Sequence, residues 1–160
     1  MTGPVLFWVQ HLLGIGHQRR SAAIARATAA AGLEVHYISG GMPVPDIDLA
    51  GCQFHQLPPC RSPDENFSAL VDGQGQAVQP DFWAERRSRI SRLISETGPA
   101  VFVTETYPFG RRAFRHELLP ALKQVSRTGV NVASVRDILV RKPDPARYQE
   151  SADLIDRYYQ

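Results

Sequence analysis

The sequence has few cysteines, no long apolar run and almost no net charge, and each shortage excludes a class of protein. Its two cysteines, Cys52 and Cys60, lack the spacing of metal ligands and are too few for a disulfide scaffold. No apolar run approaches the ~20 residues that a membrane-spanning helix needs. The first apolar stretch, Val5 to Val9, also lacks the preceding basic residues of a signal peptide. A net charge of +2 provides little general attraction to nucleic acid. We therefore expect a reduced, cytoplasmic chain that binds no nucleic acid.

Several enzyme motifs are missing as well. The stretch Gly14-x-Gly16-x-x-Arg19 has an arginine where a dinucleotide-binding fingerprint has its third glycine, and the next predicted strand ends in Ser39 and Gly40 rather than in an acid. There is no Gly-Lys-Ser/Thr phosphate loop, no Gly-x-Ser-x-Gly elbow and no cluster with metal-ligand spacing. These absences argue against NAD(P) enzymes, kinases, serine hydrolases and metalloenzymes, and we expect neither a cofactor nor a metal.

What the sequence does contain is a regular alternation of apolar strands and helices. Strands are predicted at residues 4–9, 34–39, 52–57, 100–104 and 130–135, and helices at residues 18–31, 81–96, 111–125 and 145–159. Unbroken apolar strands that alternate with helices are typical of a parallel sheet covered on both faces. The predicted fold class is therefore α/β, a three-layer doubly wound Rossmann-like domain with a mainly parallel sheet, over residues 1–160. Residues 58–80 are expected to form an irregular loop, in which Asp72-Gly73 could close a small hairpin.

Basic residues cluster directly after three of the predicted strands. They are Arg19 and Arg20, then Arg111 and Arg112, and finally Arg136, Arg141 and Lys142. Ligands of such sheets bind outside the carboxyl ends of the strands, and the guanidinium fork suits phosphate and carboxylate groups. The first two clusters fall in the first turn of a predicted helix, where the helix dipole disfavours cations by ~0.3–1 kcal/mol each. Local misfits of this kind are typical of functional sites, although surface ion pairs would explain single arginines equally well.

The turn from Gly14 to His17 is the sharpest local signal. Its glycines, Gly14 and Gly16, let the backbone approach a ligand closely. His17 stands at the start of a helix, where its imidazole could take a proton from an acceptor hydroxyl or hydrogen-bond a phosphate. The alternative is a histidine that only caps the helix.

The other four histidines receive no catalytic role. His11 is expected to serve packing or turn structure, and His36 and His55 lie within strands and face either the core or the surface. His116 lies within a predicted helix and is expected to be exposed to solvent.

Two carboxylates complete the candidate catalytic set. Glu105 and Asp137 each follow a strand and could orient His17 or bind sugar hydroxyls. Each could equally be a helix-capping or turn residue. The stretch from Tyr107 to Gly110 is predicted to form a rigid apolar lip on which an acceptor stacks, with loop packing as the alternative.

Four segments of the chain resemble a group of predicted bacterial glycosyltransferases. They are VQHLLGIGHQRR at 9–20, EVHYISGG at 34–41, TETYPFGRR at 104–112 and SVRDILV at 134–140. This group is related to family 28, which includes the N-acetylglucosaminyltransferase that completes lipid II. The resemblance runs nearly from end to end, and the four segments in order are more specific than the Gly-x-Gly-His turn alone.

The resemblance implies a two-domain GT-B fold in which an N-terminal domain binds the acceptor and a C-terminal domain binds the nucleotide-sugar donor. It implies metal-independent transfer of a hexosyl group with inversion, in the cleft between the domains. His17 matches the glycine-loop histidine near the reaction centre, and Gly14 and Gly16 match the loop glycines that approach the donor phosphates. Nothing in this chain matches the donor-binding glutamate or the second glycine loop. We therefore expect an acceptor-side half that is inactive alone.

The expected partners are a nucleotide-sugar donor and a hydroxyl acceptor. The resemblance would allow a lipid-linked acceptor at the inner membrane face, and an exposed edge strand would allow a homodimer. The alternative function is a stand-alone Rossmann-like binding protein for an anionic metabolite or a sugar phosphate. The residues expected to contact phosphate, donor or acceptor are Gly14, Gly16, Arg19, Arg20, Tyr107, Gly110, Arg111, Arg112 and Arg136.

Overall fold

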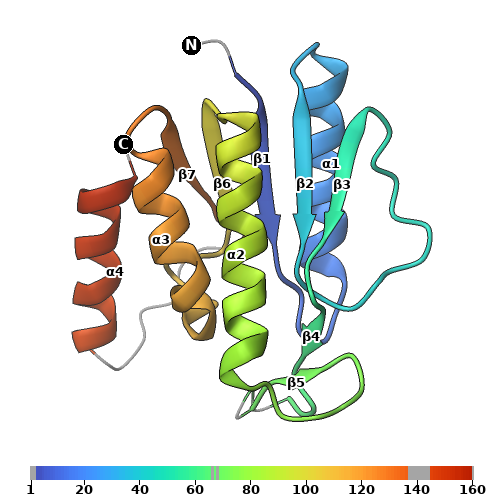
Figure 1. Ribbon diagram of the computed structural model, residues 1–160, viewed down its shortest axis with the longest axis vertical. Coiled ribbons are helices and arrows are strands. Elements are labelled where there is room, and N and C mark those ends of the chain that lie inside the picture. The colour runs from blue at the N-terminus through green and yellow to red at the C-terminus, as the bar shows by residue number, and fades with distance from the viewer. Residues whose placement is uncertain (1–2, 66, 68, 137–144, 160) are drawn as a thin grey trace.

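A five-stranded sheet forms the centre of the molecule (Figure 1). The structure is a computed structural model and describes residues 3–65, 67, 69–136 and 145–159. The strands are β1 (Val5–Val9), β2 (Val35–Ser39), β3 (Cys52–Gln56), β6 (Val101–Glu105) and β7 (Val130–Ser134). They lie in the order β3-β2-β1-β6-β7, and every neighbouring pair is parallel. The predicted fold class, a doubly wound parallel α/β domain, is confirmed.

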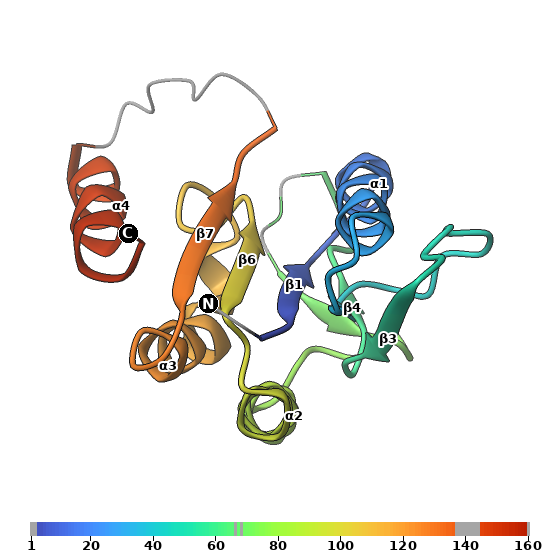
Figure 2. The ribbon, with the colours of Figure 1, turned by 90° about the horizontal axis from the view of Figure 1, so that it is seen from above.

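Helices cover both faces of this sheet (Figure 2). Helix α1 (Gly16–Ala30) lies on one face, and α2 (Pro80–Thr97) and α3 (Arg115–Val125) lie on the other. Helix α4 (Pro145–Tyr158) lies beside β7 at the edge of the sheet. Among the described residues, no helix combines the length and the apolarity that crossing a bilayer requires.

The central strand β1 divides the core into two halves. Leu6 and Trp8 are fully buried in the cluster beneath α2 and α3, whereas Val5, Phe7 and Val9 belong to the cluster beneath α1. Successive side chains of a strand point to opposite faces, so a strand with helices on both sides must be apolar at every position. Burying one such large side chain contributes roughly 1.5–3 kcal/mol.

Local sequence explains where α2 begins and ends. Pro80 occupies its first turn, where the missing N–H costs nothing, and Gly98 ends it with a left-handed φ of 57°. Both ends lie within one residue of the predicted helix at residues 81–96. The helix predicted from Arg111 begins later, because Arg111 itself has a left-handed φ of 58°. A 3₁₀ turn, η1 (Arg112–Phe114), then leads into α3.

The segment 58–80 contains short strands as well as irregular chain. β4 (Cys60–Arg61) pairs antiparallel with β5 (Val71–Asp72). The turn after β5 is held by Asp72, whose Oδ1 accepts hydrogen bonds from the backbone N–H groups of Gln74 and Gln76, both at 2.9 Å. This aspartate explains the tight turn that the Asp72-Gly73 pair indicated.

Candidate active site

The carboxyl ends of β1 and β6 are neighbours at the point where the chain reverses its direction across the sheet. From β1 the chain winds outward to β2 and β3, and from β6 it winds the opposite way to β7. The loops that follow β1 and β6 therefore run in opposite directions. The gap between them is the position where doubly wound folds bind ligands. Helix α1 begins at this position with Gly16, and β6 ends there with Glu105.

His17 and Glu105 meet at this switch point. The Nδ1 atom of His17 lies 2.6 Å from the Oε1 atom of Glu105. The Glu105 side chain is 2% exposed and the His17 side chain is 26% exposed. An ionised carboxylate can only accept hydrogen bonds, so in the neutral imidazole Nδ1 carries the proton and Nε2 keeps its lone pair. The pair thus combines a buried acid with a solvent-accessible imidazole in the tautomer that a general base needs.

Thr106, the first residue after β6, shares the same carboxylate oxygen of Glu105. Thr106 Oγ1 donates to Glu105 Oε1 at 2.6 Å, while Oε2 of Glu105 is buried and bonded to none of the described residues. Thr106 adopts a left-handed φ of 66°. Non-glycine residues in this region are strained and cluster at functional sites. In this conformation the hydroxyl of Thr106 bonds to Glu105.

Gly110 and Arg111 close this turn. A Cβ atom at Gly110 would lie 2.7 Å from the Cγ2 atom of Thr106, so the turn requires glycine there. The left-handed Arg111 then donates from Nε to the backbone oxygen of Gln10 at 2.8 Å. Burial lowers the pKa of Arg111, and the nearby Glu105 acts in the opposite sense. Arg111 is therefore a partly desolvated cation next to the His17–Glu105 pair.

Two further predicted arginines lie where α1 meets β7. Arg20 donates from Nη1 to Ser134 Oγ at 2.8 Å and from Nη2 to the oxygen of Val135 at 3.1 Å. A Cβ atom at Gly16 would lie 3.1 Å from Nη1 of Arg136, so this guanidinium packs over the first residue of the helix. Arg20 thus joins two elements, and Arg136 lies over the amino end of α1, where an anion would be favoured.

Other predicted site residues lie elsewhere. Arg19 lies with Arg26 and Asp48 on the outer side of α1, and Arg112 forms an ion pair with Glu150 of α4. Tyr107 is buried, and burial raises the pKa of its hydroxyl to about 12. Its ring packs in the core and so cannot form part of the lip predicted for residues 107–110, whereas Phe109 and Gly110 are half-buried. Asp137, Arg141 and Lys142 lie outside the described residues.

His11 and His116 have the environments that the sequence predicts. His11 is buried against Gly41, whose lack of a side chain makes room for the imidazole ring. Burial lowers the pKa of His11, the neighbouring Gln18 opposes this shift, and Arg111 adds to it. His116 is exposed on α3.

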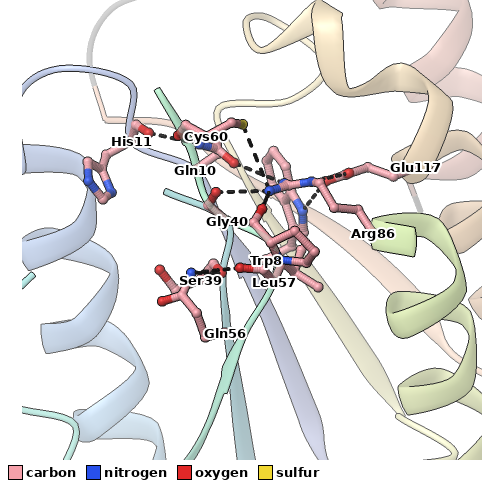
Figure 3. A network of polar contacts seen from close by, with 11 residues as sticks. Trp8, Gln10, His11, Ser39, Gly40, Gln56, Leu57, Cys60, Arg86 and Glu117 are labelled. Carbon is pink, nitrogen blue, oxygen red and sulfur yellow. Dashed lines mark hydrogen bonds and ion pairs between the residues drawn. The ribbon is translucent and has the colours of Figure 1, made fainter. Parts of the chain in front are cut away.

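A buried ion pair beneath the site escaped the sequence analysis (Figure 3). Arg86 of α2 is fully buried, and its Nε and Nη2 atoms donate to the two carboxylate oxygens of Glu117 of α3 at 2.6 and 2.8 Å. Its Nη1 atom donates to the oxygens of Gly40 and Pro58 at 2.9 and 2.7 Å, and Nη2 also donates to Gln10 Oε1 at 3.0 Å. All five donors of the guanidinium thus have partners, as a buried charge requires.

This ion pair also supports the loop that carries the site. The side chain of Gln10 accepts from Arg86 and donates to the backbone oxygens of His11 and Cys60 at 2.8 and 3.2 Å. The backbone oxygen of Gln10 holds Arg111. The sequence signal was the spacing of Arg86, which lies four residues before the buried Ile90 and therefore on the buried stripe of α2.

The described residues contain no group of three or more His, Cys, Asp or Glu side chains that could hold a metal ion.

No family model matches the chain, and no curated protein matches it. Among solved structures, the chain is similar to UGT2 of Phytolacca americana, in the apo form and in complex with UDP-2fluoro-glucose and pterostilbene. The TM-score is 0.49 for both, at 12% and 13% identity, and each match covers 84% of this chain. It is also similar to a UGT transferase from Siraitia grosvenorii in complex with UDP, with a TM-score of 0.46, 15% identity and 81% coverage of this chain. The chain spans 30% and 31% of the two UGT2 chains and 27% of the Siraitia chain.

Proposed function

We propose that this chain is the acceptor-binding domain of a glycosyltransferase that uses a nucleotide-sugar donor, with His17 as the general base. The observation that supports this proposal is the 2.6 Å contact between His17 Nδ1 and the buried Glu105, at the switch point of a doubly wound sheet. A base with a free Nε2 lone pair and a buried carboxylate behind it can deprotonate a hydroxyl near neutral pH.

The proposed reaction is a direct displacement. Nε2 of His17 takes the proton of the acceptor hydroxyl while the hydroxyl oxygen attacks the anomeric carbon of the donor sugar. The bond between that carbon and the diphosphate oxygen breaks, the nucleoside diphosphate leaves with the electron pair, and the configuration inverts. Glu105 stabilises the imidazolium that forms, in the way that a buried carboxylate stabilises a catalytic histidine.

Cations near this site would oppose the negative charge that develops on the leaving diphosphate. Arg111 is partly desolvated beside the His17–Glu105 pair, and Arg136 packs over Gly16 at the amino end of α1. Backbone N–H groups at a helix start and guanidinium groups both favour phosphate oxygens. We assign the phosphate contacts to Arg111, Arg136 and the loop glycines Gly14 and Gly16. The proposed reaction needs no metal or cofactor.

A companion domain would supply the donor site, and the isolated chain is proposed to be inactive without it. The first measurement is the size of the native polypeptide in its source cells, by immunoblot against this domain. A band at roughly twice the mass of this chain, the size of two domains, supports a half-enzyme. A band at the mass of this chain contradicts a covalently attached donor domain and leads to a search for a partner chain.

The catalytic test uses the active native polypeptide. Replacing His17 by Ala should lower turnover by about 10²–10⁴-fold. The matched control is His116→Ala, since His116 is exposed on α3 and should leave turnover unchanged. Equal turnover of wild type and His17→Ala would remove His17 as the base.

The acceptor class is tested separately. The family resemblance extends the proposal to a hexosyl donor and to a lipid-linked acceptor at the inner membrane face, and transfer to acceptors in vesicles should then exceed transfer to water-soluble alcohols. Calorimetry of the isolated chain tests the alternative function: tight binding of one sugar phosphate without turnover of the native polypeptide would favour a binding protein.

A further inference from the structure

A hydrogen-bonded chain of side chains joins the edge strand β3 to β2, on the sheet face covered by α2. His36 of β2 pairs in register with Gln53, and Ile38 pairs with His55, so His36 and His55 are diagonal neighbours across the two strands. Nδ1 of His36 lies 2.9 Å from Nε2 of His55, and Nε2 of His36 lies 3.0 Å from Oε1 of Glu34. None of these residues belongs to the candidate active site.

The two imidazole rings meet end to end. Their planes differ by 15° and their centroids are 5.2 Å apart, while the facing nitrogen atoms are only 2.9 Å apart. The nitrogen atoms therefore lie close to the line between the ring centres. This is the arrangement of an N–H···N hydrogen bond, in which one proton lies between two nitrogen lone pairs.

The carboxylate determines where the protons are. Glu34 can only accept, so His36 donates to it from Nε2 and presents Nδ1 as an acceptor. His55 must then donate from Nε2, which leaves its own Nδ1 without a proton. When both imidazoles are neutral, the hydrogen bonds can run in only one direction: His55 donates to His36, and His36 donates to Glu34.

We propose that this chain of His55, His36 and Glu34 is an acid-sensitive clamp on strand β3, which stays closed when it takes up one proton and opens when it takes up two. The first added proton can bind Nδ1 of His55 and leaves the N–H···N bond intact. The second must bind Nδ1 of His36. Two N–H groups and two positive charges then face each other where one hydrogen bond had been.

The surroundings of the clamp contain charges of both signs. A cavity of about 210 Å³ between α2 and β3 is lined by His55 and by Arg89, Arg92 and Glu96 of α2. Gln53 donates to the same Glu34 oxygen as His36, at 3.1 Å. Burial lowers the pKa of His55, His36 lowers it further, and Glu96 acts in the opposite sense. Arg89, Arg92 and the adjacent imidazole therefore oppose positive charge on the pair, a second one most of all, whereas Glu34 and Glu96 favour it.

Opening of β3 would also displace the segment that follows it. That segment supplies the backbone oxygen of Pro58 to Arg86 and the backbone oxygen of Cys60 to Gln10. These bonds support the loop beneath the candidate active site. The clamp therefore links protonation of His36 and His55 at the edge of the sheet to the hydrogen bonds that hold the loop beneath the candidate active site.

The test is amide hydrogen exchange followed by NMR between about pH 7.5 and pH 4.5, a range that spans the ordinary pKa of histidine. After correction for intrinsic exchange, the opening constant of β3 amides should rise at least ~10-fold more than that of β6 amides as the pH falls. At the acid end it should rise by up to ~100-fold per pH unit, because two protons are taken up. The proposal would be overturned if the opening constants of β3 and β6 amides rose equally as the pH falls. It would also be overturned if the rise for β3 never exceeded the ~10-fold per pH unit of a single proton.

Glutamine is the matched replacement, because its amide has one acceptor and one donor group and does not titrate. The double variant His36→Gln/His55→Gln should retain β3 protection at neutral pH and lose its excess acid sensitivity. Sensitivity equal to that of wild type would contradict the clamp. If the double variant does not fold, the ¹⁵N imidazole shifts of the wild-type chain decide: protons on Nε2 of both histidines at neutral pH are expected, and the opposite tautomer of His36 would overturn the assignment.

Discussion

The Arg86–Glu117 pair and the His17–Glu105 pair both join a carboxylate to a basic side chain, and they differ in how completely they are bonded. In the Arg86–Glu117 pair every guanidinium donor has an acceptor, and Glu117 also accepts from Trp8 Nε1 at 2.9 Å. In the His17–Glu105 pair, no described residue bonds to Nε2 of the imidazole or to Oε2 of Glu105. A fully bonded pair holds elements together, whereas a pair with hydrogen-bonding atoms left over can bind a ligand or exchange a proton with it.

The largest expected effect breaks the fully bonded pair. Glu117→Gln removes the negative charge that neutralises the buried Arg86, and this should lower the free energy of unfolding by about 3–5 kcal/mol. Glu105→Gln is the matched control, since the bonds of that carboxylate are incomplete, and it should change stability by less than about 1 kcal/mol. Urea unfolding of both variants measures the difference. Similar losses for the two variants would contradict the comparison.

A glycine substitution tests the same contrast through packing. A Cβ atom at Gly40 would collide with Gln10 Oε1 and lie 2.5 Å from Nη2 of Arg86, so Gly40→Ala should cost about 1–3 kcal/mol of stability. Gly16→Ala meets only Nη1 of Arg136, at 3.1 Å, where the end of a flexible side chain can move. It should change stability by less than about 0.5 kcal/mol. Thermal unfolding of the two variants side by side checks the order, and a larger loss for Gly16→Ala would reverse it.

The smallest expected effect concerns pH. Burial lowers the pKa values of His11 and His55 in the folded chain, so the unfolded chain binds more protons as the pH falls through the ordinary histidine pKa of about 6.5. The contribution of these groups to stability is complete above that pH and declines below it, toward the lower folded-state pKa values. Denaturant unfolding at about pH 7.5, 6.5 and 5.5 should show this decline, and His55→Gln should reduce its slope. A rise in the free energy of unfolding on acidification across this range would contradict the predicted direction of the pH dependence.

The outcome for particular residues shows where sequence reasoning succeeds. The strands and α2 lie within one or two residues of their predicted bounds, because continuous apolar runs, Pro80 and Gly98 act locally. The sequence placed His17 and Glu105 at the same edge of the sheet, and the structure brings them into contact. Their catalytic role remains a prediction.

The tertiary structure separates residues that look alike in the sequence. Arg19 and Arg112 resembled their neighbours Arg20 and Arg111 in sequence, yet Arg19 lies on the outer side of α1 and Arg112 pairs with Glu150. Tyr107 followed a strand in the same way as Glu105 but packs into the core. Arg111 has a left-handed backbone conformation, so the helix predicted to begin there begins later. The residue type arginine does not indicate that conformation.

By itself the sequence determined the alternation of strands and helices, the doubly wound sheet and the set of polar residues at its carboxyl edge, since these depend on periodicity and on residues that are close in the chain. Only the tertiary structure decided which charges are satisfied and which are left to act. Glu117 accepts from Trp8 across 109 positions, and His17 reaches Glu105 across 88. Hydrogen-bond partners at such separations are chosen by how helices pack on a sheet, and that packing decides whether a carboxylate stabilises the fold or serves a reaction.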